Sequence, residues 1–380
     1  LEVFKLGNFD LHAKDFHIDS MAIHKRGLWY SRCFAFEAND ISGRLTARNH
    51  QFRVKRLALD TEVRAFVIQD ISLNPIYAKT HNDFLSGTVS ALRIGGLKYD
   101  KGISADSILI QHPTVRYVTT SEVAPVKSRR AQTHTKNVRH SDVYDMLDPF
   151  LRYLSVKRFR IDNAEVALND RRKADPTEYK LEHFNFRVND ILFDEQTRRQ
   201  NDLLFDYGEI GFDFSRFDNY LPGKDYRLAV DKCSFSTLEG VLSMQNIRLT
   251  PQDTLFRHSH LYIRAASPSL IISGLKRLPD KPAKNLYFTS LLLNQPDLFV
   301  QKDDGSRFSI QLKKISADDV AWDSTAFRMQ TIALTSPIVN VYVKQQKKGR
   351  ETAAKPLPMA VPKDLYTTLS NISDEISLKR

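Results

Sequence analysis

An internal repeat constrains the fold of this chain of 380 residues more than any other feature of its sequence. Residues 52–75 align with residues 228–251 without a gap, so that Leu59 matches Phe235. The offset between matching segments is about 175 to 183 residues along the chain. Self-similarity at a fixed offset marks a repeat architecture in which each copy is one structural unit. The sequence therefore predicts two tandem modules.

Shorter motifs recur in the same order. The pentapeptide "IGGLK" at 94–98 returns as "ISGLK" at 272–276. An apolar run interrupted by a proline, at 108–118, returns at 291–300 and more loosely at 332–343. Because several unrelated motifs keep their order, duplication of a whole module explains the pattern better than a chance match.

We expect the domain boundaries to follow the repeats. We predict a first β-groove repeat over 1–118 and a second over 155–343. A basic flexible connector with a short helix follows each repeat, over 119–154 and 344–380. Asp142 and Asp364 stand where a helix cap would be in the two matching connectors. The second connector stops where the first enters a strand, so we expect a fragment that breaks off at the start of another repeat. A natural C-terminus is the alternative.

The spacing of apolar residues favours strands. Apolar positions follow a two-residue step, a three-residue step and another two-residue step, as in Leu242, Met244, Ile247 and Leu249. On a helix these positions fall on no single face, whereas a strand needs only one extra residue in its middle to keep them together. We expect a β-bulge at this step, at Asp70, Asp190 and Asn246. Bulges aligned across neighbouring strands would crease the sheet along one line.

Composition and charge exclude several classes of protein. A chain with 42% hydrophobic residues can bury a core and is not disordered throughout. The net charge of +11 comes mostly from 119–140 and 344–363, which carry +4 and +5. Since the rest of the chain is close to neutral, we expect no nucleic-acid partner. We interpret the basic segments as solvated loops, or alternatively as contacts for anionic lipid headgroups.

The sequence contains no recognisable catalytic motif, so we expect no enzymatic activity and no cofactor. Cys33 and Cys233 lack the spacing of a redox or zinc site. His258 and His260 would share one face of a strand, but we interpret them as surface residues rather than metal ligands. Asp304 is followed by glycine and predicts a hairpin turn.

The predicted fold class is all-β, with long, bent, mostly antiparallel strands in tandem repeats that form an elongated groove. Many strands would reach 11 to 15 residues, well above the usual length of about 5 to 6. Two short helices cannot cover so large an apolar sheet face. Either the groove holds an apolar ligand, or a second sheet covers it and the chain is a structural or adhesive β-sandwich array.

These long strands with a shared mid-strand step, in modules joined by short connectors, resemble the AsmA-like superfamily of Gram-negative envelope proteins and the bridge-like lipid transfer proteins with repeating β-grooves. Residues 156–170, 186–196 and 241–251 carry the resemblance. It implies non-enzymatic transport of phospholipid or another acyl lipid between membranes along a hydrophobic groove, with membrane or envelope partner proteins at the ends of the array. It also implies a periplasmic location and an inner-membrane anchor outside this chain.

The candidate site is the apolar lining of this groove, with no catalytic residue and no metal. Its predicted members are the apolar residues on both sides of the mid-strand step. They are Phe9, Leu11, Phe16, Ile18, Phe52, Val54, Leu57, Leu59, Phe66, Ile68, Ile71, Leu73, Phe184, Phe186, Ile191, Phe193, Leu228, Val230, Phe235, Leu242, Met244, Ile247 and Leu249.

Overall fold

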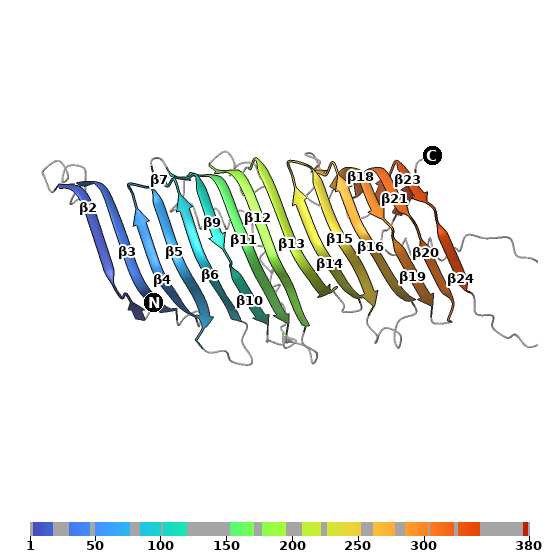
Figure 1. Ribbon diagram of the computed structural model, residues 1–380, viewed down its shortest axis with the longest axis horizontal. Coiled ribbons are helices and arrows are strands. Elements are labelled where there is room, and N and C mark those ends of the chain that lie inside the picture. Colours follow the sequence, from blue (N-terminus) through green and yellow to red (C-terminus); the bar gives the residue numbers. More distant parts are fainter. Residues whose placement is uncertain are drawn as a thin grey trace, which may run out of the picture. The chain divides into compact units, whose positions relative to one another are not determined.

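The computed structural model shows an all-β protein (Figure 1). It describes residues 3–17, 30–45, 50–76, 84–99, 102–119, 153–170, 177–194, 207–221, 226–251, 261–277, 286–302, 305–322, 326–342 and 375–378. The chain forms two compact units, Leu1–Phe214 and Ser215–Arg380, which divide within one strand. The predicted boundary at the connector 119–154 therefore stays a prediction.

Unit 1 is built on one mostly antiparallel sheet. Its strands are β1 (Val3–Lys5), β2 (Phe9–His17), β3 (Tyr30–Leu45), β4 (His50–Asp60), β5 (Ala65–Pro75), β6 (Phe84–Gly95), β7 (Lys98–Tyr99), β8 (Ile103–Ala105), β9 (Ser107–Gln111), β10 (Thr114–Thr119), β11 (Leu154–Asp170), β12 (Thr177–Phe193) and the start of β13 (Glu209–Tyr220). From β2 to β6 each strand pairs antiparallel with the next. Then β9 and β10 together lie along β6, and β11 pairs with both in parallel. Finally, β12 pairs antiparallel with β11.

Unit 2 has the same kind of pairing and begins with the end of β13. Its further strands are β14 (Tyr226–Ser236), β15 (Val241–Pro251), β16 (Leu261–Ser273), β17 (Lys276–Arg277), β18 (Leu286–Asn294), β19 (Asp297–Lys302), β20 (Arg307–Gln311), β21 (Lys314–Trp322), β22 (Ala326–Met329), β23 (Thr331–Thr335), β24 (Ile338–Tyr342) and β25 (Glu375–Leu378). The pair β18 and β19 lies along β16, β21 and β20 lie along that pair, and β23 and β24 follow. Only β25 is parallel to its neighbour, β22, among the described strands of this unit.

A line of left-handed backbone crosses the sheet of unit 1. Asp40, Asp70, His112 and Asn163 all have φ between 46° and 55°, a region that costs most side chains about 1 to 2 kcal/mol. The strand register brings them into one line, because Asp70 lies across from Ser90 of β6, which in turn lies across from the break between β9 and β10. Asn163 lies across from the same break on its other side. The left-handed residues of β3 and β5 flank β4, which has none at this line, and the pairing of β4 with both neighbours keeps its register on either side.

The prediction of a single crease is wrong in one respect. Asp190 does have a positive φ, of 55°, but it lies across from Lys157 and not from Asn163. It belongs to a second line that includes Gly96, whose φ is 68°. Spacing within one strand locates an irregular residue, whereas only the pairing register decides which irregular residues align.

Prolines mark the corresponding line in unit 2. Asn246, with a φ of 51°, lies across from Pro268 of β16. The line continues through Gln295–Pro296, between β18 and β19, and through Ser336–Pro337, between β23 and β24. Proline has no backbone N–H, so it fits a sheet only where the hydrogen-bond ladder is broken. The line of broken pairing is therefore where these strands can accommodate proline.

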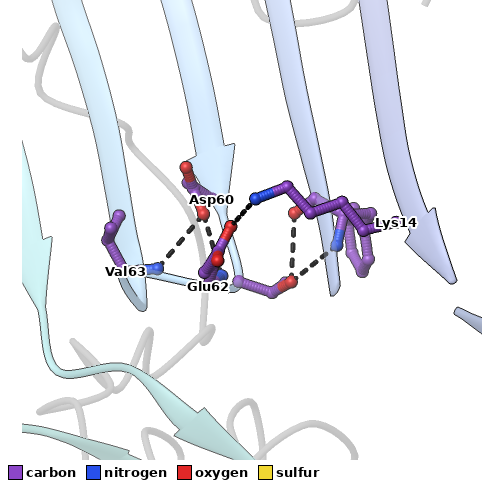
Figure 2. A network of polar contacts seen from close by, with 6 residues as sticks. Lys14, Asp60, Glu62 and Val63 are labelled. Carbon is purple, nitrogen blue, oxygen red and sulfur yellow. Dashed lines mark hydrogen bonds and ion pairs between the residues drawn. The ribbon is translucent and has the colours of Figure 1, made fainter. Parts of the chain in front are cut away.

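A polar network fixes the turn between β4 and β5 (Figure 2). The carboxylate of Asp60 accepts the backbone N–H groups of Glu62 and Val63 at 2.8 and 3.2 Å. The ammonium group of Lys14 on β2 pairs with the Glu62 carboxylate. Because Lys14 comes from two strands away, the network ties the turn to the edge of the sheet.

The short helices predicted in the connectors are not seen among the described residues. Of the two predicted connectors, 119–154 and 344–380, the structure describes only short pieces: Thr119 ends β10, Leu154 starts β11, and residues 375–378 form β25. The start of β11 pairs in parallel with β8, and β25 pairs in parallel with β22. The rest of both predicted helices lies outside the described residues.

Candidate functional site

The candidate site is one face of each sheet, formed by rows of apolar residues that lie directly across from each other. We call such a row a rung. In unit 1 one rung crosses eight strands. It consists of Phe9, Ala38, Leu57, Ile68, Leu92, Ile110, Ile161 and Phe186. Directly paired residues point to the same side of a sheet, so these side chains form one apolar strip.

A second rung lies beside the first, and others lie beyond the crease. The second rung is Leu11, Phe36, Leu59, Phe66, Ile94, Ile108, Phe159 and Val188. Beyond the line of left-handed residues come Ile41, Val54, Ile71 and Val89. Val54 and Leu57 are three apart in β4 and are both apolar rung members, and Lys55 between them lies across from Asp40 and Asp70, the left-handed residues of the neighbouring strands.

Unit 2 has equivalent rungs on six successive strand positions. One contains Cys233, Met244, Leu270, Leu293, Ile315 and Leu334. Its neighbour contains Phe235, Leu242, Ile272, Leu291, Ala317 and Ile332. A third, across the crease, contains Leu228, Leu249, Ala265, Leu298, Ile310 and Val339. We call this side of each sheet, defined by its rungs, the apolar face.

Most rung members are half-buried, and those of β2, β23 and β24 are exposed to solvent. Leu11 is 53% exposed and Leu334 is 55% exposed, whereas Ala38 and Val188 are 0% exposed. Among the described residues the packed core cluster is small, with Phe288, Ala317 and Val320 at its centre. An apolar surface of this extent is unusual for a soluble domain and marks an interaction surface.

The opposite face carries the charges. Arg56 donates hydrogen bonds of 2.9 and 2.8 Å to the Glu37 carboxylate, which lowers the pKa of Glu37 and raises that of Arg56. In unit 2, Asp231 accepts hydrogen bonds from Asn246 and Arg248. Residues across from each other on this side include Ser42, Arg53 and Ser72. The two faces therefore differ strongly in polarity.

The hollows among the described residues lie mainly on this polar side. One, of about 560 Å³, is lined mainly by polar side chains, among them Ser42, Arg44, Gln51 and Arg53. Another, of about 420 Å³, is lined mainly by Arg160, Asp162, Asn185 and Arg187. None of them is the kind of enclosed apolar pocket that typifies a small-molecule site.

The structure brings most of the predicted lining residues together on the apolar face. Phe16 and Val230 lie in the expected strands without a described apolar rung, and Ile247 lies across from a serine, Ser267. Phe193 pairs through its backbone with Leu154. Ile18 lies outside the described residues.

Several rung members were missing from the prediction. They contribute as much to the rungs as those predicted, and include Ala38, Leu92, Ile94, Ile108, Ile110, Phe159, Ile161, Leu270, Leu293, Ile315 and Val339. The repeated apolar run at 108–118, 291–300 and 332–343 was the signal that identifies many of them.

No cluster of potential metal ligands occurs among the described residues. In that part of the chain, no helix has the length and apolar character needed to cross a membrane.

Cys233 is buried, and its burial raises the thiol pKa to about 11. A thiol with so high a pKa is a poor nucleophile at neutral pH, so it acts here as a small apolar rung member.

Comparison with known proteins gives no relative for this chain. No protein-family model matches it. A search of curated proteins also finds no match. Its function must therefore be argued from the geometry of the two faces.

Proposed function

We propose that this chain is a non-enzymatic lipid carrier, and that the apolar face holds the acyl chains of phospholipids or related lipids. The observation that carries the proposal is the continuity of the apolar rungs, which extend over eight paired strands in unit 1 without a charged member. A surface that binds one specific small molecule needs no such length.

The energetics suit a ligand that slides. Each methylene group removed from water contributes about 0.8 kcal/mol, independent of its exact position along the face. A rung member offers dispersion and hydrophobic contact but no directional bond, so moving a lipid from one rung to the next exchanges equivalent contacts. Lipid headgroups would remain in water at the strand ends.

On this proposal the face belongs to an elongated groove made of tandem repeats, as in the AsmA-like and bridge-like lipid transfer proteins that the sequence resembles. Matching positions of the two copies support the repeat, since Asp70 and Asn246 have φ values of 50° and 51°, and Gly96 and Gly274 have φ values of 68° and 67°. Membrane or envelope partner proteins at the ends, and a periplasmic setting, belong to the same proposal.

The test is lipid extraction and native mass spectrometry of the purified chain, followed by transfer of a fluorescent phospholipid from donor to acceptor vesicles. We expect co-purified phospholipid and transfer that increases with protein concentration. A chain that carries no lipid and transfers none would overturn the proposal. The competing β-sandwich array predicts that outcome, because a second sheet would then occupy the apolar face.

A further inference from the structure

The strands β22, β23 and β24 reproduce β8, β9 and β10 element by element. Each series has a short strand, a five-residue strand, an X–Pro interruption and a further strand. The residue before the proline, His112 or Ser336, has a left-handed φ of 46° or 51° in the two series. The backbone therefore has the same conformation at matching positions of the two series.

Both series receive a parallel strand at the same place. In unit 1, Leu154 at the start of β11 lies across from Ile103 of β8. In unit 2, Ile376 of β25 lies across from Phe327 of β22. Both series therefore begin with a short strand, β8 or β22, that pairs with a parallel strand.

The two series differ beyond this first contact. In unit 1, β11 continues along β9 and β10, with Ile161 across from Ile110 and Val166 across from Val115. In unit 2, the described pairings of β23 and β24 are those with β21 and β20. Exposure reflects this difference in β23, whose residues are all exposed whereas those of β9 are half-buried. Residues 114–117 of β10 are exposed, as is all of β24.

The matched pairs of β10 and β24 differ in the same direction but by unequal amounts. Val115 is 40% exposed and its counterpart Val339 is 51% exposed, whereas Val118 is 1% exposed and its counterpart Tyr342 is 62% exposed. Natural proteins protect an exposed strand edge with charged residues or very short strands. Residues 331–342 contain no charged residue, and Pro337 lies at the interruption rather than within either strand.

We propose that the edge formed by β23 and β24 is an acceptor for one extended polypeptide strand, bound parallel to it in the register that β11 takes on β9 and β10. The bound strand would continue the parallel pairing begun by β25. Main-chain hydrogen bonds would supply the affinity, and apolar residues at alternate positions would extend the rungs whose last described members are Leu334 and Val339. This inference does not depend on lipid binding.

Disulfide trapping tests the edge, the direction and the register together. The probe is a peptide with the sequence of residues 159–170, carrying Ile161→Cys or Val166→Cys. The full chain carries Leu334→Cys or Val339→Cys, in a background with Cys33→Ser and Cys233→Ala. Parallel binding in the register of β11 joins Leu334→Cys to Ile161→Cys and Val339→Cys to Val166→Cys, since directly paired Cα atoms are close enough for a disulfide.

The crossed combinations are the matched controls. We expect at least ten times more cross-linked product from the two parallel combinations than from the crossed ones, and no excess with a scrambled peptide. An excess in the crossed combinations would show antiparallel binding and overturn the proposal. So would equal yields with the scrambled peptide, or a chain that forms dimers through this edge in size-exclusion chromatography and excludes the peptide.

Discussion

Asp70 in β5 and Asn246 in β15 have the same left-handed backbone conformation, with φ values of 50° and 51°, at matching positions of two repeated segments. Both residue types tolerate this region better than most, because their short polar side chains can form local hydrogen bonds. Asn246 donates a hydrogen bond of 2.9 Å to Asp231 on the neighbouring strand, and a carboxylate oxygen of Asp70 lies 3.4 Å from the ammonium nitrogen of Lys55. The irregular residue is therefore a repeated feature of the strands.

The conformation of Asp70 predicts an unusual response to glycine. Asp70→Gly should leave the free energy of unfolding unchanged or raise it by up to about 1 kcal/mol, because glycine adopts a positive φ without strain. Asp70→Val should lower it by about 2 kcal/mol, since a β-branched residue resists this conformation. At Ser72, whose φ is not positive, glycine should instead destabilise by about 0.5 to 1 kcal/mol. Urea unfolding of the three variants measures these differences, and a destabilising Asp70→Gly would contradict the assignment.

Charge on the apolar face should remove lipid binding. Phe235 belongs to a rung, whereas Ser234 beside it points to the other side of the sheet and pairs with Ser243. We expect Phe235→Asp to reduce co-purified phospholipid and vesicle transfer several-fold, because a carboxylate among acyl chains pays a large desolvation cost. Ser234→Asp should retain both. Urea unfolding verifies that the two variants are folded, and equal loss in both would contradict the assignment of faces.

The two cysteines should differ in reactivity. Burial raises the pKa of the Cys233 thiol to about 11, so about one molecule in a thousand carries a thiolate there at pH 8. Cys33 is only partly buried. We expect a maleimide at pH 8 to label the Cys233→Ala variant much faster than the Cys33→Ser variant, with equal rates in denaturant. Mass spectrometry follows the labelling, and equally fast labelling of the folded variants would show that Cys233 is not buried.

The ion pair between Glu37 and Arg56 should make stability depend on acidity. Arg56 lowers the pKa of Glu37 in the folded chain, so the stabilisation is present above the ordinary pKa of a glutamate and is lost as the pH falls through the lowered value. Glu37→Gln should therefore reduce stability at pH 7 more than at pH 3. Urea midpoints at the two pH values measure this, with Arg56→Gln as the matched control. An unchanged pH dependence in both variants would contradict the pairing.

The sequence alone determined the local character of each strand. Alternation with a three-residue step predicted strands over helices, and it located Asp70, Asp190 and Asn246 as irregular residues, all of which have a positive φ. It also grouped residues such as Leu57 and Leu59 on one face. These properties depend on neighbours within one strand, so a single sequence contains them.

Only the tertiary structure decided how the strands combine. The parallel pairing of β11 with β9 and β10 joins segments separated by a long connector, and no local pattern specifies it. The same is true of the register that places Asp70 and Asp190 on different lines, and of the parallel pairing of β25 with β22. Backbone hydrogen bonds between strands join residues remote in sequence, and their register fixes which irregular positions and which apolar residues become neighbours.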